Sequence, residues 1–165
     1  MIDIEKLREH LLYNPATGWF TWIKSGAEVR VTVGTRAGSL QANGYRGIRF
    51  EGKRYREHIL AVFLQTGSWP TQPIDHRDNS RTGRSNNKWD NIRVATPSLN
   101  RANARLRADN QSGRKGVYRQ GSRWRAQIRV DGALKHLGYF DTVDAAHGAY
   151  TRAADAAFGD FACHG

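Results

Sequence analysis

Four polar residues between positions 75 and 100 have the types and spacing needed for metal-assisted cleavage of a phosphodiester. Asp75 and His76 are adjacent, and Asn91 and Asn100 follow at short range. Carboxylate and amide oxygens are hard ligands, so we expect Asp75 and Asn100 to hold one Mg²⁺ or Mn²⁺ ion. We expect His76 to accept a proton from the attacking water, and Asn91 to fix the tautomer of that imidazole. The alternative is that all four are ordinary residues of a polar loop and a helix.

The distribution of charge favours a nucleic-acid substrate. The formal net charge is +11, and the stretch from Arg93 to Lys135 holds eleven Lys and Arg but only two Asp. A positive charge concentrated in this way is typical of a protein that binds a polyanion. We therefore expect a nucleic acid as the partner, and an RNA-binding or ribosomal protein would also fit the charge.

Composition excludes several other classes of protein. Cys163 is the only cysteine, which excludes internal disulfides and multi-cysteine zinc sites. No apolar run approaches the roughly 18 residues of a membrane span. The first residues have neither the basic start nor the apolar stretch of a secretory signal. We expect a cytoplasmic protein that binds no membrane.

The elements around the four residues are predicted to form a small ββα unit. Residues 73–76 read as a short strand, residues 77–90 as a polar loop, and residues 92–96 as the return strand. Thr96 and Pro97 have the chemistry of an N-cap and a first helical residue, so we expect a helix to carry Asn100. Upstream, the pattern predicts a small α+β unit with helices over 4–12 and 58–66 and short strands between them. His58 lies in an apolar stretch, and we interpret it as a buried structural residue.

The third segment has the period-two pattern of a sheet with one apolar and one polar face. Trp124, Ala126, Ile128 and Val130 alternate with Arg125, Gln127 and Arg129. We expect Tyr118 and Gln120 to share the polar face from the preceding strand, and His136 from the following one. In a DNA major groove, arginine reads guanine edges and glutamine reads adenine. The alternative is an ordinary solvated face. Asp131-Gly132 predicts the hairpin turn, and Thr142 and Gly159 bound a predicted helix.

Arginines outside this sheet are candidates for phosphate contacts. Arg101 and Arg105, in the stretch that joins the two halves, are expected to follow the DNA backbone, unless they form only a solvated helix end and linker. Arg93 has two possible roles, to clamp the scissile phosphate or to pair with an acidic neighbour.

Residues 73–103 resemble the HNH endonuclease family, in the variant whose last motif position is Asn. The resemblance is carried by Ile74-Asp75-His76, the string from Ser85 to Arg93, Thr96 and Asn100. The first segment is also similar to the N-terminal part of phage-type homing HNH proteins, through Asn14 to Trp22, Gly44-Tyr45-Arg46, Tyr55 to His58 and Thr66 to Pro70. The resemblance implies a ββα-metal fold, Asp75 and Asn100 as metal ligands, His76 as general base and Asn91 as the residue that orients it.

Residues 110–162 resemble the plant APETALA-type (ethylene-response-factor) DNA-binding domain. The matching strings include Lys115-Gly116-Val117, Arg123 to Arg129, Leu137 to Phe140, Ala145-Ala146 and Phe158-Gly159. The resemblance implies three strands packed on one helix, with the sheet in the major groove. By position it implies DNA contacts for Lys115, Tyr118, Gln127, Arg129 and His136, and the alternation of the strand adds Arg125.

Together these observations predict an α+β protein with an HNH nuclease domain over 1–107 and an APETALA-type DNA-binding domain over 108–165. Within the first domain we expect an N-terminal α+β part over 1–72 and the metal core over 73–107. The expected function is metal-dependent, site-specific DNA cleavage of the homing type, by nicking as a monomer or on both strands as a homodimer, in a bacterial host cell if the gene is carried by a phage. The alternative is a non-catalytic DNA-binding regulator with a vestigial nuclease fold.

Overall fold

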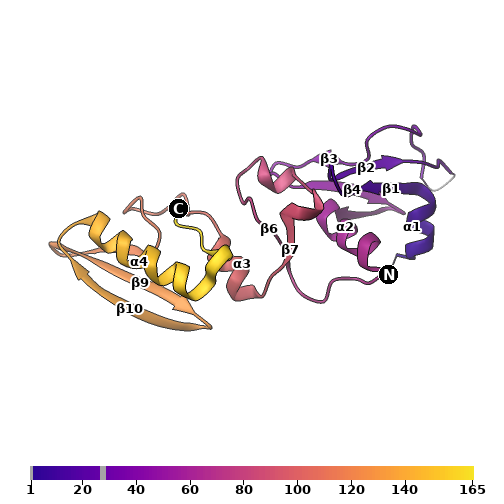
Figure 1. Ribbon diagram of the computed structural model, residues 1–165. Helices are drawn as coiled ribbons and strands as arrows, with labels where there is room; N and C mark the ends of the chain where they lie inside the picture. The colour runs from indigo at the N-terminus through magenta and orange to yellow at the C-terminus, as the bar shows by residue number, and fades with distance from the viewer. Residues whose placement is uncertain (1, 27–28) are drawn as a thin grey trace. The chain divides into compact units, whose positions relative to one another are not determined.

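The computed structural model describes residues 2–26 and 29–165. The chain contains both helices and strands, and the strands form several small sheets, which confirms the α+β class. The chain divides into two compact units, Met1–Val94 and Ala95–Gly165, which are described separately (Figure 1). No helix in the described part of the chain is both long enough and apolar enough to cross a membrane.

The described residues of the first unit form three small antiparallel sheets and two α-helices. Helix α1 (Ile4–His10) leads into the hairpin β1 (Leu11–Asn14) and β2 (Trp19–Trp22). A second sheet has the order β3 (Ser39–Leu40), β4 (Arg46–Phe50) and β5 (Lys53–Arg56), and α2 (Glu57–Thr66) follows it. The third sheet pairs β6 (Ile74–His76) with β7 (Ile92–Val94). Two short 3₁₀ turns, η1 (Gly83–Ser85) and η2 (Trp89–Asn91), lie in the loop between β6 and β7.

The first helix ends two residues earlier than its apolar spacing predicted. Leu11 and Leu12 are extended, because they pair with Trp22 and Thr21 across the first hairpin. Leu11 still reaches the core, where it is buried with Leu7 and Phe20. The helix expected over 58–66 is confirmed, with Glu57 as its first residue and Gly67 as its left-handed C-cap.

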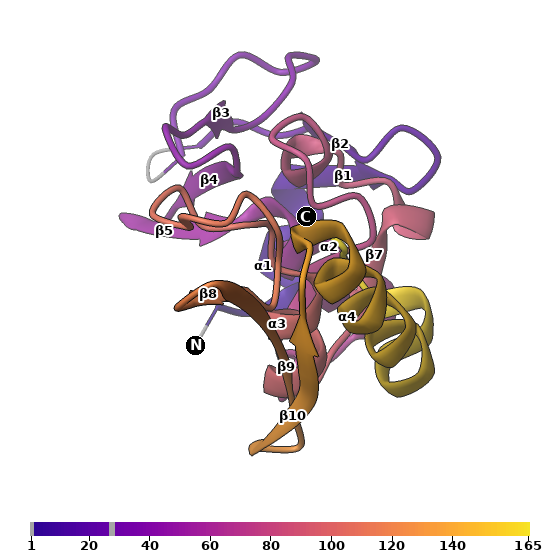
Figure 2. The same cartoon turned by 90° about the vertical axis from the view of Figure 1, so that its left-hand side faces the viewer.

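The second unit is a three-stranded antiparallel sheet packed on a long helix. It contains α3 (Pro97–Asn103), β8 (Val117–Gln120), β9 (Arg123–Val130), β10 (Ala133–Phe140), α4 (Val143–Phe158) and the 3₁₀ turn η3 (Gly159–Phe161). The strand order is β10-β9-β8, and α4 lies along one face of the sheet (Figure 2). Both predicted caps are confirmed: the hydroxyl of Thr96 accepts from the backbone N–H of Leu99, and the hydroxyl of Thr142 accepts from that of Ala145.

The first unit ends at Val94, thirteen residues before the boundary at 107 that we expected from the sequence. The reason is that α3 packs with the C-terminal sheet and helix. Ala102 is buried in a cluster with Ile128, Tyr150 and Phe158. The sheet also approaches α4 closely at Gly116, where a Cβ atom would lie 2.0 Å from Cδ2 of Tyr150. This position has a φ of 72°, so glycine is required there for both space and backbone conformation.

Candidate functional site

Asp75 and Arg93 form a buried ion pair across the β6–β7 hairpin. They are register partners, and Nε and Nη2 of Arg93 both donate to Oδ2 of Asp75, at 3.1 and 3.0 Å. The exposed fractions of the side chains are only 7% for Arg93 and 9% for Asp75. Of the two roles that the sequence left open for Arg93, the structure therefore shows the pairing with an acidic neighbour. We therefore do not propose Arg93 as a DNA contact.

His76 is buried next to Asp75, and its ring is held by Asn87. Nε2 of His76 lies 2.9 Å from Oδ1 of Asn87. The side chain of Asn91 is engaged with backbone instead: its Oδ1 accepts from the N–H of Asp78, and its Nδ2 donates to the carbonyls of Gly83 and Asn86. Asn91 thus holds the loop that carries Asn87. The residue that contacts the imidazole of His76 is Asn87, whereas the sequence led us to expect Asn91 in that role.

A chain of buried polar groups continues behind Asn87. Its Nδ2 donates to Oε2 of Glu57 at 2.9 Å, and Oε1 of Glu57 accepts from Nε of Arg46 at 3.0 Å. Glu57 and Asn87 are 0% and 1% exposed. Burial raises the pKa of Glu57, and the charge of Arg46 and the Asn87 hydrogen bond oppose that rise. No chemical pattern in the sequence joined these residues, although all three lie in the strings that carry the HNH resemblance.

Two aromatic rings lie beside the buried imidazole of His76. The ring centroids of His58 and His76 are 4.8 Å apart with the planes at 78°, and Tyr45 lies 5.4 Å from His58 and 5.8 Å from His76. The pKa of His58 is lowered to about 3, chiefly by burial, with smaller contributions from His76 and Arg56. The pKa of His76 is also lowered, chiefly by burial, while Asn87 and Asp75 oppose the change. Both imidazoles are therefore neutral at pH 7, and a neutral imidazole has the lone pair that a general base needs.

A positive surface borders these rings in the first unit, and the sequence analysis did not single it out. The guanidinium carbons of Arg56 and Arg84 lie 4.9 and 5.6 Å from the ring centroid of Tyr45. Arg84 is close enough for its charge to depress the pKa of His76. Arg49 and Arg54 face each other on the neighbouring strands, and both are exposed. The signal for this surface was present in the high density of arginine over 46–56.

The expected metal ligands lie in different units of the chain. Asp75 belongs to β6 of the first unit, and Asn100 is an exposed residue of α3 in the second. Residues 2–26 and 29–165 contain no group of three or more His, Cys, Asp or Glu side chains that could hold a metal ion. The donor chemistry of a carboxylate and an amide oxygen does fit Mg²⁺, which usually keeps water and phosphate oxygens as its other ligands.

In the second unit, the register confirms the shared polar face of the sheet. Tyr118 pairs with Arg125, and His136 pairs with Gln127; Leu134 pairs with Arg129. Residues directly opposite each other on neighbouring strands project from the same face. Tyr118, Arg125, Gln127, Arg129 and His136 therefore form one surface, as expected.

Tyr139 also belongs to this surface, which the sequence analysis did not anticipate. A bulge between His136 and Gly138 shifts the register of β10, so that Tyr139 lies opposite Arg125. Its ring centroid lies 4.7 Å from that of His136. Simple alternation from His136 would have placed Tyr139 on the opposite face.

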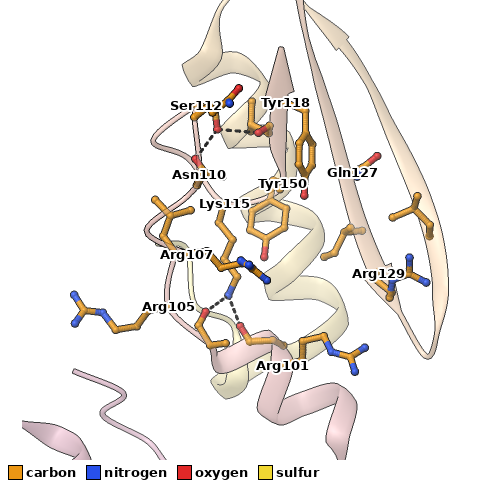
Figure 3. Close-up of a pocket in the computed structure, with 18 of the residues that line it drawn as sticks. Arg101, Arg105, Arg107, Asn110, Ser112, Lys115, Tyr118, Gln127, Arg129 and Tyr150 are labelled. Atoms are coloured by element: carbon orange, nitrogen blue, oxygen red, sulfur yellow. Dashed lines mark hydrogen bonds between the residues drawn. The ribbon is translucent and has the colours of Figure 1, made fainter. Parts of the chain in front are cut away.

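Lys115 lies at the end of a hollow and does not project from the sheet. Its ammonium donates to the carbonyls of Ala102 and Ala104 and ties α3 to the start of β8 (Figure 3). Burial lowers the pKa of this lysine. We therefore assign Lys115 a structural role in place of the DNA contact that the family resemblance implied.

The hollow beside Lys115 has a volume of about 1010 Å³ and basic walls. Figure 3 shows Arg101 and Arg107 pointing toward the side of the sheet that carries Arg129, whereas Arg105 points away from it. Arg107 is paired with Asp109, and Nη1 of Arg129 donates to the carbonyl of Gly132. Of the linker arginines expected to contact DNA, Arg101 is the one that faces the reading surface.

Comparison of the chain with protein-family models, with curated proteins and with solved structures found no match. The functional interpretation therefore depends on the side chains described above.

Proposed function

We propose that the protein is a metal-dependent endonuclease that hydrolyses phosphodiester bonds of double-stranded DNA. The observation that carries the proposal is the buried, neutral His76, held by Asn87 and adjacent to Asp75. A histidine kept neutral by burial is suited to accept a proton from water. The hydrogen bonds from Glu57 through Asn87 to His76 can hold the imidazole in one orientation, as a general base requires.

The roles of the residues follow from their chemistry. His76 accepts the proton of the attacking water, and Arg93 neutralises part of the charge of Asp75. Asp75 is the proposed protein ligand of a Mg²⁺ ion in the first unit, and the ion when bound would stabilise the charge that develops on the phosphate and the leaving oxygen. Arg56 and Arg84, stacked on Tyr45, supply positive charge for the DNA backbone close to the imidazole.

The second unit supplies recognition of the DNA site. A surface of Tyr118, Arg125, Gln127, Arg129 and His136 offers the side chains that read base edges in a major groove. Arg101 is placed to contact the backbone next to that surface. One proposed active site per chain favours nicking by a monomer, and a homodimer would cut both strands.

Nicking of a supercoiled plasmid tests the proposal. The wild-type protein should convert supercoiled to open-circular DNA with Mg²⁺ and should be inactive with EDTA. His76→Ala should abolish nicking and leave DNA affinity nearly intact, because the imidazole is buried and does not belong to the proposed reading surface. His164→Ala is the matched control, since His164 is an exposed histidine paired with Asp155. Full nicking by His76→Ala would reject the assignment.

A non-catalytic DNA-binding regulator is the second candidate. The observation that favours it is the deep burial of Asp75 and His76, at 8% and 3% exposure, with Asp75 already paired to Arg93. This candidate predicts tight binding of duplex DNA with no nicking in Mg²⁺ or Mn²⁺. Competition between duplex DNA and RNA in the same binding assay tests whether the partner is DNA at all.

A further inference from the structure

We infer that Glu57 and Asn87 are positioning residues that fix His76 as the tautomer protonated on Nε2, so that the lone pair lies on Nδ1. The geometry on which this inference stands is the buried chain from Arg46 through Glu57 and Asn87 to His76. Its catalytic consequence rests on the proposed nuclease function. The tautomer itself can be measured whether or not the protein cleaves DNA.

The direction of each hydrogen bond follows from the chemistry of the groups. An ionised carboxylate can only accept, so the atom of Asn87 that lies 2.9 Å from Oε2 of Glu57 must be the donating amide nitrogen. The other atom of that amide is then the carbonyl oxygen, which can only accept. Nε2 of His76, 2.9 Å from this oxygen, must therefore carry the proton.

Arg46 fixes the orientation of the Glu57 carboxylate. Nε of Arg46 donates to Oε1 of Glu57, and Nη2 donates to the carbonyl of Gly38 at 2.9 Å. A guanidinium cannot accept a hydrogen bond, so the polarity of the chain is set at this end. Burial raises the pKa of this carboxylate, and its ion pair with Arg46 opposes that rise, so we take Glu57 in its ionised form.

Asn87 is held by its backbone as well as by its side chain. The hydroxyl of Tyr13 donates to its carbonyl at 2.7 Å. The turn at Gly18 packs against the same peptide so closely that a Cβ there would lie 2.3 Å from the carbonyl carbon of Asn87. An amide fixed on both sides in this way cannot rotate to offer its nitrogen to the imidazole without breaking its bond to Glu57.

Substitution of Glu57 by Gln should reverse the chain without changing its shape. The oxygen of the new amide would accept from Arg46, and its nitrogen would donate to Asn87. Asn87 would then turn its own nitrogen toward His76, and the imidazole would carry its proton on Nδ1. The double substitution Glu57→Gln with Asn87→Asp should restore the original direction, because an aspartate at 87 accepts from both neighbours.

The test is long-range ¹H–¹⁵N correlation NMR of the full chain with labelled histidine at pH 8, with the His76 signals identified by their loss in His76→Gln. The wild type should show the Nε2–H pattern, Glu57→Gln should show the Nδ1–H pattern, and the double variant should return to Nε2–H. Glu9→Gln, at an exposed glutamate paired with Lys24, is the matched control and should leave the spectrum unchanged. An Nδ1–H pattern in the wild type, or an Nε2–H pattern that persists in Glu57→Gln, would overturn the inference. The wild-type spectrum decides the question even if Glu57→Gln does not fold.

Plasmid nicking by the same variants separates this inference from the proposed function. If both hold, Glu57→Gln should lower kcat by about 100-fold or more with little change in KM for DNA, and the double variant should recover most of that loss. If the wild type shows the Nε2–H pattern but cuts no DNA, the nuclease proposal fails and the positioning chain stands. If the wild type cuts DNA but shows the Nδ1–H pattern, the positioning inference fails and the nuclease proposal stands.

Discussion

Asp75 and Arg93 face each other across a two-stranded hairpin, and two guanidinium nitrogens donate to a single carboxylate oxygen. The pair is buried, so each charge supplies the other with hydrogen bonds in place of water. It also places a fixed positive charge directly behind the carboxylate that we propose as a metal ligand.

Arg93→Ala should destabilise the protein by about 3–5 kcal/mol, because it leaves a buried carboxylate without this guanidinium. The free energy of unfolding is measured by urea denaturation at pH 7.5 in EDTA. Arg54→Ala, at an exposed arginine of β5, should change it by less than about 0.5 kcal/mol. A loss below about 1 kcal/mol for Arg93→Ala would show that the ion pair is not buried as described.

Stability should fall as pH drops below 6.5, because His58 takes up a proton on unfolding and resists protonation when folded. Its pKa is about 3 in the folded protein against 6.5 as the ordinary value, so the unfolded state binds more protons over this interval. Between pH 6.5 and 5 the expected loss from this residue is about 2 kcal/mol. Arg56 and His76 are the neighbouring groups that lower the pKa of His58 besides burial. The buried Glu57 has a raised pKa, so its protonation increases the stability of the folded protein as pH falls and opposes the loss from His58.

The contribution of His58 is therefore measured as the difference between wild type and His58→Phe. Urea denaturation of both proteins at pH 7.5 and pH 5, in EDTA, should show a smaller loss for the variant. Equal losses in the two proteins would contradict a buried, neutral His58.

Lys115→Met should reduce stability and leave the electrostatics of DNA binding unchanged. The ammonium donates to two backbone carbonyls that join α3 to the sheet, and the loss of a buried hydrogen-bond partner costs about 1–3 kcal/mol. The salt dependence of DNA affinity should keep its slope, whereas removal of a lysine that neutralises a phosphate would reduce that slope by about 1. Lys135→Met, at an exposed lysine of β10, is the control for stability.

Arg129→Ala should weaken discrimination between DNA sequences by about 1–3 kcal/mol if Arg129 reads a base. Its bond to the carbonyl of Gly132 holds the guanidinium at the tip of the sheet, on the same face as Gln127. Selection of binding sites from a random DNA library compares this variant with Arg119→Ala, a residue whose strand position points it to the opposite face. An unchanged preference in Arg129→Ala would leave it as an ordinary surface arginine.

The double variant Arg56→Ala with Arg84→Ala should reduce the salt slope of DNA binding by up to about 2, because each of the two arginines is proposed to neutralise one phosphate. Both guanidiniums stack on Tyr45 next to the candidate base. Binding is measured by fluorescence anisotropy over a range of salt concentrations. Arg8→Ala, at an exposed arginine paired with Glu5, is the control. An unaltered slope in the double variant would exclude this surface from DNA binding.

The features that local sequence predicted correctly are those that depend on neighbouring residues. Period-two alternation over 123–130 predicted which side chains share the polar face, because successive residues of a strand point to opposite sides. Thr96 and Thr142 predicted the starts of their helices because an N-cap needs only a hydroxyl two or three residues before free backbone N–H groups. The adjacent Asp75 and His76 also defined the candidate site from local sequence, and the role of that site stays a prediction.

Tertiary structure decided which distant residues meet these groups. Glu57 and Asn87 are 30 positions apart, and no periodicity links them to each other or to Arg46. The bulge after His136 moved Tyr139 to the reading surface, and the packing of Ala102 assigned α3 to the second unit. Sequence alone therefore determined the charge, most of the elements and the residues first considered for chemistry. The partners that orient those residues were decided by long-range packing, because hydrogen bonds between remote segments form only once the core has brought them together.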